Sequence, residues 1–399
     1  EEKPCYYFLH EAAIVSTKEM AAFLETVRDQ DRVLLSGDPE QLQRVETGAP
    51  FAQLIAEGAV SVVRMTGIRR QTDLKLREIA TAFAEGRSKT AIDYAIKDYA
   101  ETVKITRGSG VRGKPLAGER RQAIAERAAE AYLEQSPADR DDCLLLVGND
   151  DVRKSINDKV RAGLVEEGRV DTDTEITLQT VEKTNLTSVQ RRDVISYQPG
   201  LVVRNRDGDH DVQGHDPIAR TISLRRRGTD ETRDMNIDYL RDRRTRIYQA
   251  SERQIAPGDR LVVTENDQQT GVRNGDWLSV DSVDQDAGTI SATRQADNKA
   301  IELDAGKALA VDYGWARTIH KSKDVTAERV IVAGAASRIA MAEQAYIACS
   351  RERSWLQVIT DNPEKLRQTW QKFNAKQTAR ATLNQDAQQQ SGGKGVSTD

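Results

Sequence analysis

An acidic residue directly after an apolar run is the first place in this chain where chemistry could occur. The run Tyr6–Leu9 has the length and composition of a buried strand, and His10 and Glu11 follow it. Enzymes that hydrolyse nucleoside triphosphates place two carboxylates at such a strand end, one to orient Mg²⁺ and one to polarise the attacking water. Here Glu11 is acidic but His10 stands at the first position, and an imidazole is a poor ligand for a hard cation.

A second apolar run, residues 32–35, ends in a segment that could contact a bound phosphate. The segment is SGDPEQL and contains Gly37, Asp38 and Gln41. Ligands of α/β proteins bind at the carboxyl ends of parallel strands, and from there Gln41 could reach a γ-phosphate or the attacking water. The same pattern also suits an ordinary strand-to-turn junction, so its weight depends on its spacing to other motifs.

Three further segments carry residues that could contact phosphate or a nucleic-acid strand. Residues 67–71 read GIRRQ and include Arg70, which could equally lie on a solvated face. Residues 313–326 place a threonine, a histidine and a lysine after a short apolar run. Residues 346–353 read YIACSRER, in which Arg351 follows a helical pattern. An arginine that reaches across a cleft stabilises charge on a phosphoryl group in transfer.

The elements that must position these residues alternate between strand and helix. Short apolar strands at Tyr6–Leu9, 32–35 and 61–65 are separated by helical patterns at residues 17–28 and 51–56. This alternation predicts a parallel sheet covered on both faces. A second α/β pattern follows, with helices at 72–100, 119–134 and 152–164 and strands at 142–147, 308–311, 330–332 and 356–359.

A stretch of different character, residues 171–304, interrupts the second α/β pattern. Short β-type runs alternate there with turn signals such as Asn274-Gly275, which predicts a small β-rich module inserted into the second domain. After a final helical pattern at residues 363–376, the end from residue 384 is rich in Gln, Ser and Gly and has the composition of a disordered tail.

The composition limits the classes of protein to consider. The 399 residues are 38% hydrophobic and 31% charged with a net charge of −4, so any contact with nucleic acid must come from local patches. The sequence contains no apolar run near the roughly 18 residues that cross a membrane. The three cysteines are dispersed without CxxC spacing, which predicts buried thiols in a reducing, cytoplasmic setting rather than disulfides or a metal site.

Taken in order, these segments resemble the helicase motifs of RecD-like superfamily 1B enzymes, and most closely the helicase region of conjugative relaxases of the TraI/TrwC (MobF) type. The resemblance covers residues 5–365. The correspondence runs through His10-Glu11 as motif II, residues 37–42 as motif III, Arg70-Gln71 as motif IV, residues 318–326 as motif V and residues 346–353 as motif VI. The segment from Gly258 to Asp276 is similar to the SH3-like module of the same enzymes.

The resemblance implies an α/β fold of two RecA-like P-loop NTPase lobes, one partial and one complete, with a small SH3-like β module inserted. We expect residues 1–65 to be the remainder of the first lobe (1A) and residues 66–170 with 305–365 to be the second (2A). Residues 171–304 would be the inserted module (2B), and residues 366–399 a helix followed by the tail.

The resemblance also implies residue roles. Glu11 would be the catalytic carboxylate, Gln41 the γ-phosphate sensor and Arg351 the arginine finger. The residues implied to bind the nucleotide are Gly37, Asp38, Gln41, Arg70 and Arg351. The residues implied to meet the DNA backbone are Thr318, His320, Lys321, Ser322 and Thr326. The ligands would be ATP and Mg²⁺, the metal being held through the nucleotide because His10 replaces the expected aspartate.

The chain departs from the family pattern in three places. It contains no GxxxxGK[ST] phosphate-binding loop, it has His10 for aspartate, and it has Lys323-Asp324 where the family has Gln-Gly. The family places this loop before motif II, so it lies upstream in a longer protein or is absent from it, and we expect the isolated chain not to hydrolyse ATP.

Two hypotheses of function follow. In the first, the chain is the C-terminal part of an ATP-dependent 5′–3′ DNA helicase in a conjugative relaxase, with single-stranded DNA and other conjugation or relaxosome proteins as partners. In the second, it is a vestigial helicase domain that grips single-stranded DNA without hydrolysis. Basic clusters at residues 225–227 and 241–246 could line a strand path or form a solvated face.

Overall fold

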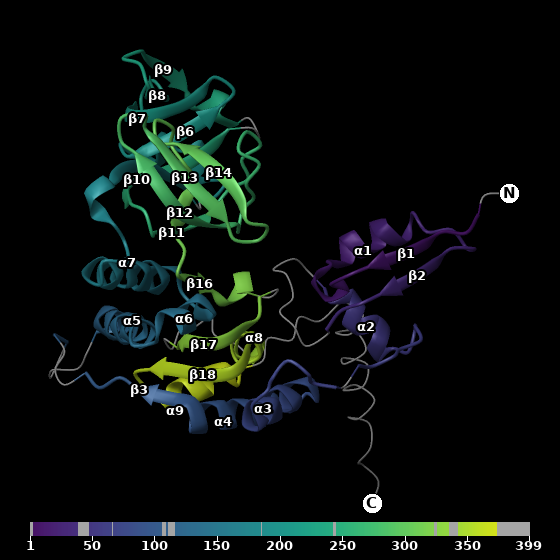
Figure 1. Cartoon of the computed structure of the whole chain (residues 1–399). Helices are drawn as coiled ribbons and strands as arrows, with labels where there is room; N and C mark the ends of the chain where they lie inside the picture. The colour runs from purple at the N-terminus through teal and green to yellow at the C-terminus, as the bar shows by residue number, and fades with distance from the viewer. Residues whose placement is uncertain are drawn as a thin grey trace, which may run out of the picture. The chain divides into compact units, whose positions relative to one another are not determined.

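The computed structural model describes residues 3–38, 48–65, 67–105, 109–110, 116–184, 186–241, 245–322, 325–334 and 342–372. The chain divides into two compact units, Glu1–Ile156 with Ala316–Asp399, and Asn157–Trp315. Figure 1 shows the elements of both. Gln41, Lys323, Asp324 and the tail from residue 384 lie outside the described residues.

The N-terminal part of the first unit is built on two parallel strands. β1 (Tyr6–Leu9) pairs with β2 (Arg32–Leu35), with Tyr6 opposite Arg32 and Leu9 opposite Leu35. The helices are η1 (Ala12–Ile14), α1 (Thr17–Leu24) and α2 (Pro50–Ala56). A capping box begins α1, because Ser16 Oγ accepts from the Glu19 amide and Glu19 accepts from the Ser16 amide. Both predicted strands are confirmed.

The third predicted strand, residues 61–65, is wrong. These residues are assigned to no strand, and Val63 and Met65 are 93% and 97% exposed. The apolar composition was correct, but a strand also needs a neighbour to complete its hydrogen bonds. Within the described residues β1 and β2 pair with each other and with no third strand.

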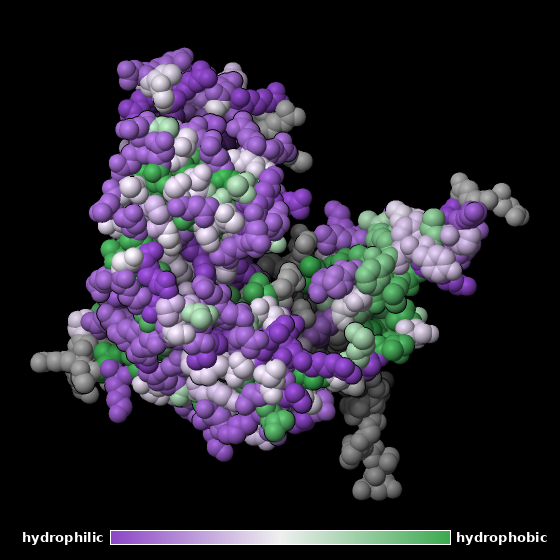
Figure 2. Space-filling view, in the orientation of Figure 1, coloured by the Kyte–Doolittle hydropathy of each residue, from purple (hydrophilic) through white to green (hydrophobic). Residues whose placement is uncertain are grey.

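The two faces of the β1–β2 sheet differ. On one face Tyr7 meets Phe23 of α1 edge to face at 5.8 Å, and Leu9 packs with Phe51 of α2. On the other face Tyr6, Phe8 and Leu34 are 82%, 63% and 62% exposed. Figure 2 shows hydrophobic surface gathered over this N-terminal segment. We call the set Tyr6, Phe8 and Leu34 the open face.

The rest of the first unit is a parallel sheet in the order β16-β4-β17-β18-β3. Its strands are β3 (Ala100–Thr102), β4 (Cys143–Val147), β16 (Ala316–Thr318), β17 (Ala327–Ala333) and β18 (Glu352–Thr360). Its helices are α3 (Leu74–Ala84), α4 (Ser88–Tyr99), α5 (Ala117–Leu133), α6 (Pro137–Asp141), η7 (Ile319–Ser322), α8 (Ala342–Ala348) and α9 (Pro363–Trp370). Helix α7 (Asp150–Glu166) begins in this unit and continues into the second from residue 157. Every residue of β4 is buried. The helices α5 and α6 lie on one side of the sheet and α3, α4 and α9 on the other (Figure 1). The mixed α/β fold with a covered parallel sheet is confirmed.

The second unit consists of two antiparallel sheets, which is more than the single small module predicted. The six-stranded sheet has the order β5-β10-β6-β7-β8-β9 and the five-stranded sheet the order β14-β13-β12-β11-β15. The strands are β5 (Ile176–Lys183), β6 (Leu201–Asn205), β7 (Gly208–Asp216), β8 (Thr221–Arg226), β9 (Thr232–Asn236), β10 (Arg246–Ile255), β11 (Arg260–Val263), β12 (Trp277–Asp284), β13 (Thr289–Arg294), β14 (Lys299–Asp304) and β15 (Val311–Tyr313). Short helices are η3 (Thr172–Thr174), η4 (Gln190–Arg192), η5 (Val194–Ser196) and η6 (Ile237–Arg241). An SH3-like identity for the five-stranded sheet stays a prediction.

The predicted strand at residues 308–311 belongs to this unit and not to the parallel sheet. β15 pairs antiparallel with β11, so that Tyr313 lies opposite Leu261, and the Thr264 amide donates to the Ala310 carbonyl. The run is too short for its composition to distinguish a parallel from an antiparallel partner. The compact unit spans residues 157–315, and the bounds 171–304 for an inserted module within it stay a prediction.

A charged cluster inside the second unit joins α7 to both sheets. Arg161 donates to Asp259 at 2.9 Å and to Glu175 at 2.8 Å, and its guanidinium lies 5.3 Å from the Tyr313 ring centroid. Gly258, at φ +91°, comes so close to the Arg169 carbonyl that a Cβ would collide with it. Glycine is therefore required at position 258, because both the positive φ and the nearby carbonyl exclude a side chain.

No helix in the described part of the chain has the length and apolar character to cross a bilayer.

Among the cysteines, Cys143 and Cys349 are buried as predicted, but Cys5 is exposed. Cys5 precedes β1, at the end of a sheet that buries one face, so its apolar neighbours do not enclose it.

Candidate functional site

The ends of β1 and β2 bring the first two motifs together. Because the strands are parallel, their carboxyl ends share one edge, and the Ala12 amide donates to the Ser36 carbonyl at 2.8 Å. A Cβ on Gly37 would lie 3.0 Å from the Ala13 amide nitrogen, so a larger residue would push this junction apart. Glu11 and Gly37 are therefore neighbours at the strand edge where α/β proteins bind ligands.

Glu11 has a strained backbone. Its φ of 57° and ψ of 41° lie in the left-handed region, which non-glycine residues occupy uncommonly. Such strain persists where surrounding structure holds it, and it concentrates at functional sites. The Glu11 carboxylate lies 3.9 Å from the His10 ring and its side chain is 35% exposed, so it can meet a ligand.

Asp38 contacts the last motif directly. The Tyr346 hydroxyl donates to the Asp38 carboxylate at 2.6 Å, although 308 residues separate them. The Tyr346 ring stacks on Phe83 of α3 with centroids 5.2 Å apart. Burial, and then the negative charge of Asp38, raise the pKa of Tyr346, which keeps the phenol protonated and able to donate.

Arg70 and its neighbour bind the same motif through backbone carbonyls. Arg70 Nη1 donates to the Ser350 carbonyl at 2.6 Å, and Gln71 Nε2 donates to the carbonyls of Ser350 and Glu352 at 3.3 and 3.0 Å. The segments predicted as motifs IV and VI are therefore joined in the folded chain, as Asp38 and Tyr346 are.

Arg351 is 3% exposed and donates to the Ser350 hydroxyl at 3.1 Å. The next residue, Glu352, is fully buried, and within the described residues neither of its carboxylate oxygens has a hydrogen-bond partner. Burial raises the pKa of Glu352 to about 8, against the opposing effect of the positive charges of Arg351 and Arg70. Sequence reasoning missed Glu352; the signal was a carboxylate at the start of an apolar strand.

The motif V residues divide by exposure. Thr318 ends β16 opposite Val147 of β4, and His320 and Lys321 are exposed. Ser322 is fully buried and donates to the Ile319 carbonyl at 2.8 Å, while Thr326 is half-buried. Among the described motif V residues from 318 to 322, His320 and Lys321 are therefore the exposed ones.

The described residues contain no cluster of three or more His, Cys, Asp or Glu side chains that could hold a metal ion. The strand edge offers the carboxylate of Glu11, while Asp38 already accepts from Tyr346. This set suits Mg²⁺ held mainly by the phosphates of a nucleotide, which is how Mg²⁺ usually binds, and it does not suit a cage of protein ligands.

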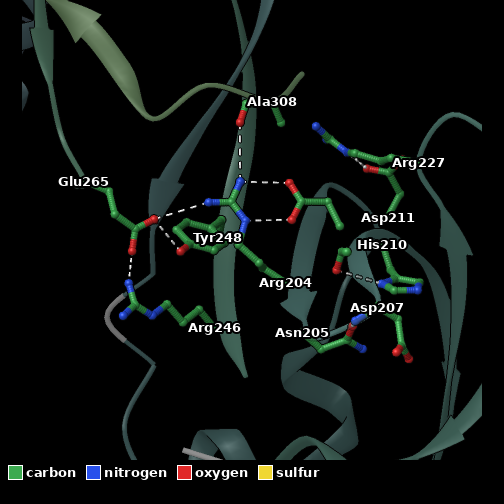
Figure 3. Close-up of polar contacts among 12 residues, drawn as sticks. Arg204, Asn205, Asp207, His210, Asp211, Arg227, Arg246, Tyr248, Glu265 and Ala308 are labelled. Atoms are coloured by element: carbon green, nitrogen blue, oxygen red, sulfur yellow. Dashed lines mark hydrogen bonds and ion pairs between the residues drawn. The ribbon is translucent and has the colours of Figure 1, made fainter. Parts of the chain in front are cut away.

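A second polar region lies inside the second unit, where its two sheets meet around a hollow of about 1100 Å³. At its centre Arg204 donates two bonds to Asp209, at 2.6 and 2.8 Å, and one to Glu265 at 3.3 Å (Figure 3). The Arg204 guanidinium also lies 4.8 Å from the Tyr248 ring centroid. Hydrogen bonding to Asp209 raises the pKa of Arg204. The central cation is therefore compensated by carboxylates.

The basic cluster at residues 225–227 lines the same hollow but is partly neutralised. Arg227 donates to Asp211 at 2.8 Å, and Arg225 lies 3.6 Å from the same carboxylate. Arg226, between them on β8, is exposed. Along a strand successive side chains alternate between faces, so Arg226 leaves β8 on the opposite face from Arg225.

Known proteins are similar in sequence to this chain over most of its length. Residues 2–108 match the family described as an AAA domain. The conjugal transfer protein TraA of Rhizobium radiobacter is 26% identical over 356 residues, which cover 88% of this chain and 24% of TraA. The multifunctional conjugation protein TraI of Escherichia coli is 22% identical over 402 residues, covering 91% of this chain and 22% of TraI. The chain thus spans less than a quarter of the length of these relatives.

A shorter match and two solved structures complete the comparison. The RecBCD enzyme subunit RecD of Mycolicibacterium smegmatis is 30% identical over 129 residues, covering 29% of this chain and 23% of RecD. Bacteroides Pif1 bound to ssDNA is 12% identical and covers 97% of this chain and 76% of that chain with a TM-score of 0.42. Pif1 helicase from Candida albicans is 11% identical and covers 96% and 76% with a TM-score of 0.43. At these TM-scores the structural likeness assigns neither fold nor function.

The motifs predicted from the sequence occur in the same order as in RecD-like enzymes, and the sequence relatives are conjugation proteins and RecD. This chain therefore resembles the RecD-like superfamily 1B helicases and is a relative of the conjugal transfer proteins TraA and TraI.

Proposed function

We propose that this chain is the C-terminal part of an ATP-dependent DNA helicase that moves 5′ to 3′ along one strand, within a conjugative relaxase acting in plasmid DNA transfer. Glu11 polarises the attacking water, Gln41 senses the γ-phosphate, and Arg351 stabilises charge on the phosphoryl group. Mg²⁺ bound through ATP neutralises phosphate charge. The protein works in the cytoplasm, with single-stranded DNA and other conjugation or relaxosome proteins as partners.

The observation that carries this proposal is the contact between motifs that are remote in sequence. Tyr346 donates to Asp38 at 2.6 Å and Arg70 donates to Ser350 at 2.6 Å, while Glu11 and Gly37 meet at one strand edge. Residues that bind a common ligand must converge in this way. The strained backbone of Glu11 supports its role as the reacting carboxylate.

The test is ATP turnover by the longer protein that contains this chain together with a phosphate-binding loop. Glu11→Gln should lower kcat by about 10² to 10⁴-fold and leave nucleotide affinity within about threefold, because the change removes a proton acceptor and not a binding contact. Glu25→Gln, at the exposed end of α1, is the matched control and should keep full activity. Full turnover by the Glu11→Gln protein would overturn the proposal. Phosphate release by the isolated 399-residue chain would overturn the separate expectation that this chain is inactive by itself.

A second candidate is a vestigial domain that binds single-stranded DNA without hydrolysis. Three observations favour it: His10 stands where a second carboxylate is expected, Asp38 is occupied by the Tyr346 hydroxyl, and Arg351 is 3% exposed. A longer protein that binds single-stranded DNA and never releases phosphate would establish this candidate in place of the first.

Both candidates require DNA binding, which fluorescence anisotropy with labelled oligo(dT) would measure. Lys321→Ala should weaken binding and reduce the slope of log K against log salt by about 0.7, the value for one phosphate contact to a single strand. Arg226→Ala should do the same if the hollow of the second unit lines the strand path. Lys299→Ala, an exposed cation on β14, serves as the control. An unchanged slope with Arg226→Ala would assign the cluster to a solvated face.

A further inference from the structure

Helix α8 and the residues just after it contact segments from three of the predicted motifs. Tyr346 donates to Asp38 at the end of β2, and Gln344 Nε2 lies 3.2 Å from His320 Nε2 in η7. Just beyond the helix, the Ser350 carbonyl accepts from Arg70. One short helix therefore lies between the predicted nucleotide residues and the exposed motif V loop.

Gln344 is placed where a polar side chain is costly. It is 3% exposed, and its Oε1 is buried without a hydrogen-bond partner among the described residues. A Cβ built on Gly148, just after β4, would lie 3.7 Å from that oxygen, so the amide is confined against the end of β4. An unsatisfied buried acceptor is destabilising, and an alanine or leucine at this position would avoid it. The amide nitrogen of the same side chain lies within hydrogen-bonding distance of the His320 ring.

Gln344 and Tyr346 leave the helix on opposite sides. Residues two apart are separated by about 200° around an α-helix, so a single rigid element reaches His320 on one side and Asp38 on the other. The helix is rigid because its remaining side chains are packed: Ala345, Ile347 and Ala348 are 0% exposed. Close-packed elements shift as units rather than deform.

We propose that α8 couples the motif V loop to the nucleotide edge, with Gln344 following the position of His320 and Tyr346 passing a shift of the helix to Asp38. Both are positioning residues, because neither would touch DNA or nucleotide. The inference rests on the proposed function in one respect: His320 is taken to move when single-stranded DNA binds. It assigns to Gln344 a role that its burial and half-satisfied amide otherwise leave unexplained.

The test measures how DNA binding changes amide hydrogen exchange in the peptide that ends β2, residues 32–38, in the whole 399-residue chain. Adding oligo(dT) should change the exchange rate of this peptide at least about threefold in the unaltered protein. Gln344→Ala and Tyr346→Phe should each bind oligo(dT) within about twofold of the unaltered affinity but lose that change, because the coupling is a free energy separate from binding. Tyr346→Phe keeps the ring on Phe83 and removes the hydroxyl alone.

Matched controls carry the same substitutions on neighbouring helices. Gln368→Ala on α9, where the amide contacts Glu364, and Tyr94→Phe on α4, where the ring is 42% exposed, should keep the DNA-dependent change. Thermal unfolding of all four variants excludes a general loss of structure as the cause.

The outcomes separate the two proposals. Absence of oligo(dT) binding by the unaltered chain would overturn the proposed DNA-binding function and the coupling with it. Binding without any change in residues 32–38, or a change that survives in Gln344→Ala and Tyr346→Phe, would overturn the coupling and leave the proposed function standing.

Discussion

The two parallel sheets of this chain contain similar aliphatic residues, but these residues are buried in one sheet and partly exposed in the other. Leu145 in β4 is 0% exposed and Leu34 in β2 is 62% exposed, although both belong to short aliphatic strands. β4 lies between β16 and β17 with helices on both faces, whereas β2 pairs with β1 and has helices on one face. The burial of a strand residue is therefore set by its neighbours in space and not by its own type.

The difference predicts unequal stability. Parallel sheets are normally covered on both faces, and a two-stranded sheet is marginal by itself. Because the side chains of the open face are exposed, the N-terminal part lacks the stabilisation that burying them would give, about 25 cal/mol per Å². We expect β1 and β2 to open locally at a lower free energy than the central sheet.

The largest expected effect comes from a matched pair of leucines. Leu145→Ala should lower the free energy of unfolding by about 2–5 kcal/mol, because it leaves a cavity in a fully buried strand. Leu34→Ala should change it by less than about 0.5 kcal/mol. Urea unfolding followed by circular dichroism measures both, and a loss above about 1.5 kcal/mol for Leu34→Ala would mean that the open face is covered in solution.

The next effect concerns Glu352, the carboxyl group buried in the central sheet. The pKa of Glu352 is raised to about 8, against about 4.3 in an unfolded chain. Between these values the folded protein holds a proton that the unfolded chain releases. The contribution of this group to stability is therefore complete below the unfolded pKa and is lost as the pH rises through the folded pKa.

Glu352→Gln removes this titration while keeping the side-chain shape. The difference in free energy of unfolding between the variant and the unaltered protein should be more favourable to the variant at pH 8 than at pH 4, by on the order of a few kcal/mol. The curve of stability against pH should therefore flatten between about 4 and 8. Glu25→Gln, on the exposed end of α1, should leave the curve unchanged. A slope in that range equal to that of the unaltered protein would show that Glu352 is ionised and solvated.

A third prediction compares helix caps in the two regions. Ser16 caps α1 beside the open sheet, and Asn362 caps α9 beside the central sheet. Each change to alanine should cost about 1 kcal/mol locally. If the N-terminal part opens by itself, Ser16→Ala should speed amide exchange in α1 without lowering global stability, while Asn362→Ala should lower global stability. Equal global losses would contradict separate opening.

The smallest effect is expected on the open face itself. Phe8→Ser should leave unfolding within about 0.5 kcal/mol, because Phe8 is already 63% exposed. It should reduce binding of an apolar dye such as ANS, since exposed hydrophobic surface recruits the dye. Thr26→Ser, also at the N-terminal part, is the control. Undiminished dye binding would place the accessible apolar surface elsewhere.

Much of the local structure was predictable. Both strands of the first sheet, the buried β4, and the helices α5 and α7 follow from hydrophobic period and apolar run length, which act over a few neighbouring residues. The helical stretch predicted over residues 72–100 is instead two helices, α3 and α4. The failures at residues 61–65, at 308–311 and at Cys5 share one cause. In each case the residue types were compatible with burial or with the parallel sheet, and the outcome depended on which partner strand or covering element lay nearby.

The sequence alone determined the motif residues, their order and the resemblance to RecD-like enzymes, because these depend on residue type and spacing. The tertiary structure alone decided that Tyr346 reaches Asp38 across 308 positions, that Gln344 meets His320, and that Glu352 is buried. Local patterns encode which element forms, whereas contacts between distant segments are selected by packing and hydrogen-bond satisfaction over the whole unit.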